Sequence, residues 1–333
     1  MLTSKELFTY HTSRNFLCFA TKWTFDNDPL AALDCSSVCL VLLSGVGLTS
    51  DIWTPIVERL HNIQLQGRPF LESIWAVDRP SHGDSGVLNE SALIGCQGLS
   101  PCAEYAAAFS AFLASPLLSS KERANLVIVS HSAGVAAPVY TYSECQLDPP
   151  IRSLVLIEPT VFDSSDMGIF EQWIRRTEKF IKSQKTAWTT IDEAMSTNKI
   201  WQKFHPEVRT IIANTFFRHT RGSDFSTKTS VAQEVSAFKE VALGIDIGQR
   251  LGSIIPKIPT HLIYGSRRDY WPKALDEAFF RLIHNHQHNF ASVTPIAGES
   301  HFAPQEAPAQ VAISIYKAVV ATALQESKPV SRL

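Results

Sequence analysis

Five short runs of apolar residues, separated by longer stretches with helical periodicity, limit the folds open to this chain. Each run is almost continuously apolar, which is typical of strands that are covered on both faces of a parallel sheet. The runs are Val38–Leu43, Ile74–Val77, Asn125–Val129, Ser153–Ile157 and Thr260–Tyr264. The helical stretches include Trp53–Asn62, Ala103–Ala114 and Ala133–Glu144. Because strands and helices alternate, the sequence predicts an α/β fold with a mostly parallel, doubly wound sheet.

Two regions depart from this alternation. Phe8–Asp26 alternates more loosely and predicts an antiparallel hairpin, whereas the interval from about Phe162 to Gly252 has helical periodicity and no good buried strand. We therefore predict a core of residues 1–161 and 253–333 and a helical cap, or lid, of residues 162–252. Most aromatic side chains of this interval are expected to pack the cap on the core, and a minority to line a pocket. These residues are Trp173, Trp188, Trp201, Phe204, Phe216 and Phe217.

Charge and composition argue against several classes of partner. A formal net charge of −2 on 333 residues gives no electrostatic reason to bind nucleic acid or an anionic membrane. No apolar run reaches the roughly 20 residues that a transmembrane helix needs. Six cysteines without CxxC pairs, and a first segment without an apolar signal-peptide core, predict reduced thiols in an intracellular compartment. The spacing of His284, His286 and His288 allows a metal site, but we expect a solvated helix end and neither a metal nor a cofactor.

The strongest indication of chemistry is the sequence Ser-His-Ser132-Ala-Gly, which lies between the apolar run ending at Val129 and a helical stretch. A serine on such a tight strand-to-helix turn is exposed in a strained conformation, and it requires small residues on both sides. Ser130 and Gly134 are these small residues. The pattern predicts that Ser132 is a nucleophile, and a serine hydroxyl needs a general base to act as one.

A second glycine-containing turn, Ser44-Gly45-Val46-Gly47, follows the strand predicted at Val38–Leu43. The tetrahedral intermediate of acyl transfer carries a negative oxygen that two backbone N–H groups can stabilise. One is expected from Ala133, directly after the nucleophile, and the other from Val46, whose flanking glycines let the backbone approach a substrate.

His301 is the predicted base because it follows a glycine-containing turn after the last predicted strand, Ser292–Ile296, and precedes the last predicted helix. His131 is a competitor, but a side chain next to the nucleophile points away from the place of a base. The acid that orients His301 stays open between two residues. Asp269 follows the strand at Thr260–Tyr264, and Glu158 ends the strand at Ser153–Ile157.

Taken in order, the segments SGVG, DRPSHGDSG, SHSAG, IEP, GSRRD and GESHF resemble the landmarks of the α/β-hydrolase superfamily. The usual forms are HGxG, DxxGxGxS, GHSxGG, a late Asp and a late His, so Ser44 stands in place of a His and Ser130 in place of a Gly. The resemblance covers about Val38–Val161 and Pro259–Leu324. It implies the α/β-hydrolase fold, and some members of the superfamily place the acid where Glu158 stands. Epoxide hydrolases and dehalogenases carry an Asp at the nucleophile position, where this chain has Ser132.

More narrowly, the chain is similar to fungal peroxisomal α/β-hydrolases, a group that includes enzymes of toxin and secondary-metabolite biosynthesis, a peroxisomal lipase and acyl-CoA hydrolases. The ending Ser331-Arg332-Leu333 is a conservative variant of the peroxisomal signal Ser-Lys-Leu. We therefore expect an import receptor to bind these three residues and the protein to reach the peroxisomal matrix.

The resulting expectation is a serine hydrolase that cleaves an acyl thioester or ester through an acyl-enzyme. The expected small-molecule substrate is an acyl-CoA with a medium or long acyl chain, or an acyl compound of secondary metabolism. A carboxylesterase or lipase is the alternative within hydrolases, and a cyclase, a lyase or a ligand-binding protein of the same fold is the alternative outside them. Basic residues on one predicted cap helix are either a solvated face or a contact for CoA phosphates. They are Arg175, Arg176, Lys179, Lys182 and Lys185. The sequence leaves open whether the chain forms a homodimer.

Overall fold

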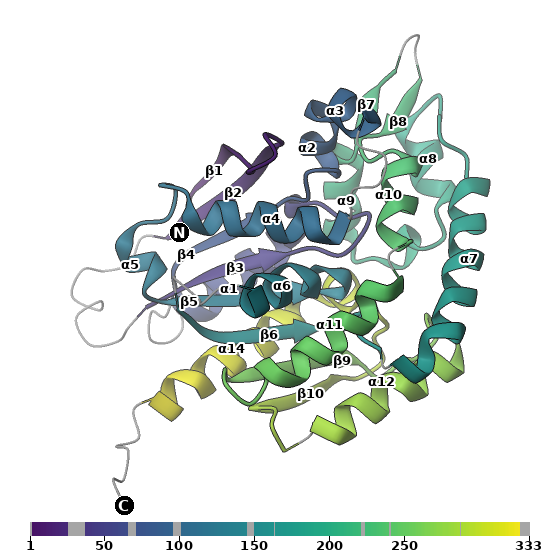
Figure 1. Cartoon of the computed structure of the whole chain (residues 1–333). Coiled ribbons are helices and arrows are strands. Elements are labelled where there is room, and N and C mark those ends of the chain that lie inside the picture. The colour runs from purple at the N-terminus through teal and green to yellow at the C-terminus, as the bar shows by residue number, and fades with distance from the viewer. Residues whose placement is uncertain are drawn as a thin grey trace, which may run out of the picture.

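The computed structural model describes residues 2–25, 37–65, 71–95, 101–144, 150–162, 164–220, 224–239, 241–286 and 288–326. These residues form an eight-stranded sheet in the order β1-β2-β4-β3-β5-β6-β9-β10, with helices on both faces (Figure 1). The strands are β1 Leu2–His11, β2 Leu17–Phe25, β3 Val38–Leu43, β4 Leu71–Val77, β5 Leu126–His131, β6 Ile151–Ile157, β9 Thr260–Gly265 and β10 Ser292–Ile296. The pairs from β4 to β10 are parallel, whereas β2 pairs antiparallel with both β1 and β4. The predicted α/β fold and its N-terminal hairpin are therefore confirmed.

Apolar side chains cover both faces of the central strands. All residues of β3 and β5 are buried, as expected for strands with nearly continuous apolar sequence. One face packs against α1 (Thr54–Leu65) and α14 (Pro308–Glu326), which also contact each other. The other face packs against α4 (Pro101–Ala114), α6 (Ala136–Glu144) and α11 (Val241–Ile254). The two hydrophobic layers hold the carboxyl ends of the strands in fixed positions, where the functional residues follow.

The chain between β6 and β9 is mainly helical and lies beyond the carboxyl ends of the strands, apart from its last helix (Figure 1). It contains α7 Met167–Ser183, α8 Ile191–Thr197, α9 Pro206–Thr215 and α10 Val231–Phe238. It also contains a short antiparallel pair, β7 (Phe217–His219) and β8 (Phe225–Thr227), in agreement with the expectation of no buried core strand. The last helix, α11, contacts α6 and adds Ile247 and Leu251 to the core cluster on that face of the sheet. No described helix has the length and apolar character needed to cross a bilayer.

A buried carboxyl joins the loops that follow β3 and β4. Asp78, directly after β4, accepts a hydrogen bond of 2.6 Å from the backbone N–H of Ser50, and the Ser50 hydroxyl lies 3.3 Å from its other oxygen. Burial raises the pKa of Asp78 to about 8, with a further contribution from the nearby charge of Asp51. Asp78 therefore ties the helical turn that begins at Ser50, directly after the loop containing Val46, to the end of β4.

This raised pKa predicts a stability change with pH. An acid whose pKa is raised on folding stabilises the protein fully below its unfolded pKa, near 3.8, and this contribution is lost as the pH rises through about 8. The free energy of unfolding of the wild type should therefore fall between pH 5 and 8. In Asp78→Asn we expect this fall to be smaller, by on the order of 1 kcal/mol or more. Urea unfolding at several pH values measures the difference, with the exposed Asp192→Asn as control. Parallel pH profiles for the wild type and Asp78→Asn would contradict the prediction.

Candidate active site

Ser132 begins the short helical turn Ser132–Val135 directly after β5 and has a φ of +54°. This left-handed conformation is unusual for a residue with a side chain and marks a sharp, strained turn. Gly134 is required there because a Cβ at this position would lie 2.7 Å from the carbonyl oxygen of Leu43. A Cβ on Gly45 would lie 2.9 Å from the Cβ of Ser132, so the turn after β3 passes very close to the serine.

His301 follows β10 and lies against Ser132. Its Nε2 is 2.9 Å from the Ser132 Oγ, and its Nδ1 is 3.2 Å from Oε2 of Glu158. A carboxylate can only accept a hydrogen bond, so Nδ1 carries the proton and donates it to Glu158. In the neutral imidazole Nε2 then accepts the hydrogen bond of the Ser132 hydroxyl, which is the arrangement that a general base needs.

The register of the parallel strands brings Glu158 to this position. His131 pairs with Ile157 across β5 and β6, and Ile157 pairs with Ile263 across β6 and β9. The ends of β5 and β6 are therefore level, and β9 continues past them to Gly265. Glu158 is buried and has a φ of +48°. Its Oε1 accepts hydrogen bonds from the Gly265 N–H at 2.8 Å and from the Arg268 guanidinium at 2.5 Å. Burial alone would raise the pKa of Glu158, but the interactions with His301, Arg268 and the Gly265 N–H lower it.

The structure thus pairs His301 with Glu158 and not with Asp269, the other candidate acid. The Asp269 side chain is 47% exposed and lies 3.3 Å from Arg267 and 3.9 Å from Lys203. The preceding residue, Arg268, which sequence reasoning did not single out, contributes the cation that holds Glu158. Arg268 also pairs with Asp276 at 2.5 Å, so its guanidinium is fixed from both sides.

Arg268 and Arg267 form a matched pair for a test of this positioning role. We expect Arg268→Met to lower kcat about tenfold with little change in KM, because Glu158 loses a charged hydrogen bond and holds His301 less firmly. Arg267→Met removes an arginine that pairs with Glu306 and Asp269, and it is the control. Steady-state kinetics of the two variants on one substrate measures the contrast. Equal effects of the two substitutions would contradict the role given to Arg268.

The two predicted oxyanion donors belong to turns that meet at Ser132. Val46 and Ala133 both line the cavity in front of the serine. Ala133 is near the start of a helical turn, where backbone N–H groups have no partner within the helix. Ser44, which stands where the superfamily usually has a His, accepts a hydrogen bond of 2.9 Å from the indole N–H of Trp53 and so stabilises the loop.

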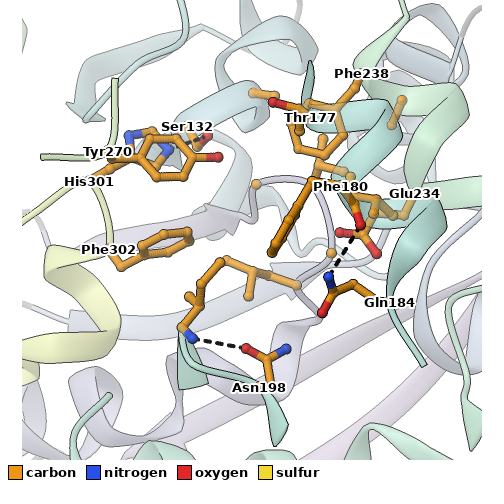
Figure 2. Close-up of a pocket in the computed structure, with 18 of the residues that line it drawn as sticks. Ser132, Thr177, Phe180, Gln184, Asn198, Glu234, Phe238, Tyr270, His301 and Phe302 are labelled. Atoms are coloured by element: carbon orange, nitrogen blue, oxygen red, sulfur yellow. Dashed lines mark hydrogen bonds between the residues drawn. The ribbon is translucent and has the colours of Figure 1, made fainter. Parts of the chain in front are cut away.

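Two further neighbours of Ser132 and His301 were not predicted from the sequence. The Thr160 hydroxyl lies 3.2 Å from the Ser132 Oγ, where it helps to orient the serine hydroxyl. The Tyr270 ring stacks on the imidazole of His301, with ring centroids 4.5 Å apart and an angle of 6° between the planes (Figure 2). His131, the rival base, donates from Nε2 to the backbone carbonyl of His301 at 2.9 Å. Burial and the nearby His301 lower the pKa of His131 to about 3, so it stays neutral.

A cavity of about 520 Å³ opens in front of Ser132 and His301 and extends beneath α7 and α10 (Figure 2). Four of the six aromatic residues highlighted in the sequence line it, more than the expected minority. They are Trp173, Trp188, Trp201 and Phe204. Phe170, Phe180 and Phe238 add to this apolar lining. The cavity has the size and character of a site for a small, largely apolar molecule.

The basic residues expected on one cap helix lie mostly outside this cavity, and Lys185 follows the end of α7 at Ser183 and is not part of that helix. Arg175 lies 3.5 Å from Glu171 and Lys182 lies 2.6 Å from Glu178, each one helical turn away. Lys185 lines the cavity but forms an ion pair with Glu193. Among the described residues, no group of three or more His, Cys, Asp or Glu side chains has a geometry suited to a metal ion, and this includes His284, His286 and His288.

A serine on a strained strand-to-helix turn, hydrogen-bonded to a histidine that a buried glutamate orients, defines the geometry of an α/β-hydrolase with a Ser-His-acid arrangement. The chain belongs to the α/β-hydrolase family, whose model matches residues 40–313.

Solved structures with the same fold include three kinds of hydrolase. The peroxisomal α/β-hydrolase Lpx1 from Saccharomyces cerevisiae is 18% identical, with a TM-score of 0.76 over 100% of this chain and 92% of that one. A thioesterase domain from the curacin biosynthetic pathway is 14% identical, with a TM-score of 0.63 over 94% and 100% of the two chains. Epoxide hydrolase VrEH1 from Vigna radiata is 12% identical, with a TM-score of 0.63 over 95% and 98%. The search of curated proteins gave no match.

Proposed function

We propose that this protein is a serine hydrolase that cleaves an acyl thioester or ester through an acyl-enzyme. The observation that carries the proposal is the distance of 2.9 Å between the Ser132 Oγ and the His301 Nε2. It is supported by the hydrogen bond from His301 to Glu158 and by the apolar cavity in front of the pair. Ser132 is the proposed nucleophile, His301 the general base and Glu158 the acid that orients it.

In the first half of the proposed reaction, His301 takes the proton of the Ser132 hydroxyl while the Oγ attacks the acyl carbonyl carbon. The backbone N–H groups of Val46 and Ala133 stabilise the resulting oxyanion. The tetrahedral intermediate collapses, the bond to the thiol or alcohol breaks, and His301 gives its proton to the leaving group. In the second half, His301 removes a proton from water, which attacks the acyl-enzyme, and the acid is released as Ser132 regains its proton.

The acyl chain is the proposed occupant of the apolar cavity. An acyl-CoA or an acyl thioester of secondary metabolism is the substrate class that we favour, and a carboxylic or lipid ester is the second. Support for a thioester comes from the curacin thioesterase domain, which shares the fold. Since Arg175 and Lys182 pair with glutamates of their own helix, support for CoA phosphate binding by α7 is weak.

We further propose that residues 162–252 act as a cap over the reactive pair, with α7 and α10 closing the cavity. The packing of α11 on α6 anchors the end of this segment to the core. The proposed peroxisomal signal, Ser331-Arg332-Leu333, lies outside the described residues. Support for a peroxisomal location comes from the signal sequence and from the likeness to a peroxisomal hydrolase. Fluorescence microscopy of the chain with and without its last three residues tests it.

A substrate panel tests the proposed reaction. Acyl-CoA thioesters and p-nitrophenyl esters of increasing chain length are incubated with the wild type and with Ser132→Ala, and the acid and the thiol or phenol are quantified. We expect equal amounts of the two products, formed only by the wild type, with a preference for chains long enough to fill the cavity. A cyclic product in place of the free acid would indicate a cyclase, and turnover of no compound by the wild type would contradict the proposal.

A further inference from the structure

Glu234 places a carboxyl in the apolar cavity, close to the turn that carries a proposed oxyanion donor. A Cβ on Gly47, which has a φ of +78°, would lie 3.4 Å from Oε1 of Glu234. The other end of the same turn, Gly45, touches Ser132. Figure 2 shows Glu234 on the side of the cavity opposite His301 and Tyr270. Two residues of chain span at most about 7 Å, so the carboxyl is within reach of a group several bonds away from the carbonyl that Ser132 would attack.

This carboxyl differs from the other described glutamates of the helical segment, because it has no partner among the described residues. Within the part of the chain that the structure describes, no hydrogen bond or ion pair reaches its oxygens. Glu178, Glu193 and Glu207 each pair with a Lys or Arg at the surface. Burial raises the pKa of Glu234. The side chain is half-buried and lines the cavity, so a ligand that offers a hydrogen bond would give its oxygens the partner that the protein does not provide.

The residues next to Glu234 hold it in place. The hydroxyl of Ser230 and the side chain of Gln233 form a capping box at the start of α10. The loop after β4 is tied to the same region, because the Gly83 N–H donates to the Thr229 hydroxyl at 3.0 Å and Lys228 pairs with Asp84 at 2.8 Å. Since its helix is fixed to the core, the Glu234 side chain is a preorganised contact for a ligand and not a mobile surface charge.

We propose that Glu234 selects acyl substrates that carry a hydroxyl group several bonds from the reacting carbonyl, an inference that rests on the proposed hydrolase function. A hydroxyl group donates to an ionised carboxylate and accepts from a neutral acid, so it satisfies Glu234 in either protonation state. Tyr270 lies with His301 on one side of the cavity and Glu234 on the other (Figure 2), and aromatic side chains such as Phe180 and Phe238 offer an apolar lining for the methylene groups in between. An ammonium group would require a fully ionised carboxylate, which the burial of Glu234 disfavours.

The test uses p-nitrophenyl octanoate and its 3-hydroxy and 6-hydroxy derivatives. For the wild type we expect kcat/KM to be about tenfold to a hundredfold higher for at least one hydroxylated ester than for the unsubstituted ester. Glu234→Leu is expected to abolish this ratio, and Glu234→Gln, which keeps the shape and a polar group, to retain part of it. Glu207→Leu makes the same change on α9 outside the cavity, and it should keep the wild-type ratio.

Each outcome separates this inference from the proposed function. A wild type that hydrolyses the three esters at similar rates, or a hydroxyl preference that survives in Glu234→Leu, overturns the role of Glu234 and leaves the hydrolase intact. A hydroxyl preference lost equally in Glu207→Leu also overturns it, since the effect would then not depend on the cavity. Absence of Ser132-dependent hydrolysis of all three esters, and of the whole panel above, contradicts the proposed function itself and the inference with it.

Discussion

Ser132→Ala is expected to lower kcat by at least about 10⁴-fold, because the only proposed nucleophile is removed while the cavity stays intact. The substitution takes away one oxygen atom and leaves the backbone turn in place. Since Ser132 has a φ of +54°, an alanine there carries similar strain, and the fold is expected to survive. Initial rates with the best substrate of the panel measure the loss, and circular dichroism and urea unfolding check the fold.

Comparison with His301→Ala sharpens this prediction. When two residues act in one step, removing both has almost the same effect as removing either, because each needs the other. We therefore expect the double variant to be about as slow as the slower single variant. Losses that multiply would show that Ser132 and His301 act independently. A folded Ser132→Ala that keeps a substantial share of the wild-type rate would show that the chemistry lies elsewhere.

Glu158→Gln is expected to lower kcat by about 10³-fold to 10⁴-fold, the second largest effect. The amide cannot accept the Nδ1–H of His301 and the N–H groups of both Gly265 and Arg268 as a carboxylate does. The imidazole then adopts the wrong tautomer and loses the charge that stabilises its protonated form. Because interactions with His301 and Arg268 lower the pKa of Glu158, the carboxylate stays ionised well into the acidic range in the wild type.

Asp269→Asn is the matched control, since it makes the same kind of change at the alternative acid. Asp269 lies at the surface beside Arg267 and Lys203, and we expect its kcat to stay within about threefold of the wild type. Steady-state kinetics of both variants decides between the two carboxylates. A large loss in Asp269→Asn together with near-normal turnover of Glu158→Gln would reverse the assignment.

Local sequence patterns were sufficient for the sheet and for the reactive pair. The continuous apolar runs predicted buried parallel strands because each central strand is covered on both faces, and β3 and β5 are fully buried. The strand–turn–helix pattern at Ser132 depends on residues adjacent in the chain, so it is readable without coordinates. His301 was identifiable because it follows the last strand, and its side chain lies within hydrogen-bonding distance of Ser132.

The orienting acid was not decidable from the sequence, since Glu158 and Asp269 both follow core strands at the same edge. The choice depends on strand register and on the side chain of Arg268, which reaches back to Glu158 across a separation of 110 residues. The positions of Thr160 and Glu234 depend likewise on long-range packing. From the sequence alone, a glutamate on an amphipathic helix is expected on the face exposed to solvent. Glu234 lies in the cavity because α10 packs close to Gly47.

Labelling with a fluorophosphonate probe, followed by peptide mapping, tests most directly whether Ser132 is an activated nucleophile. Such a probe phosphonylates a serine only when a base raises its reactivity, so the measurement does not depend on the identity of the substrate. We predict stoichiometric labelling at Ser132 in the wild type, strongly slowed labelling in His301→Ala, and none at this position in Ser132→Ala. A folded wild-type protein that remains unlabelled at Ser132, or that is labelled at another serine, would contradict the account.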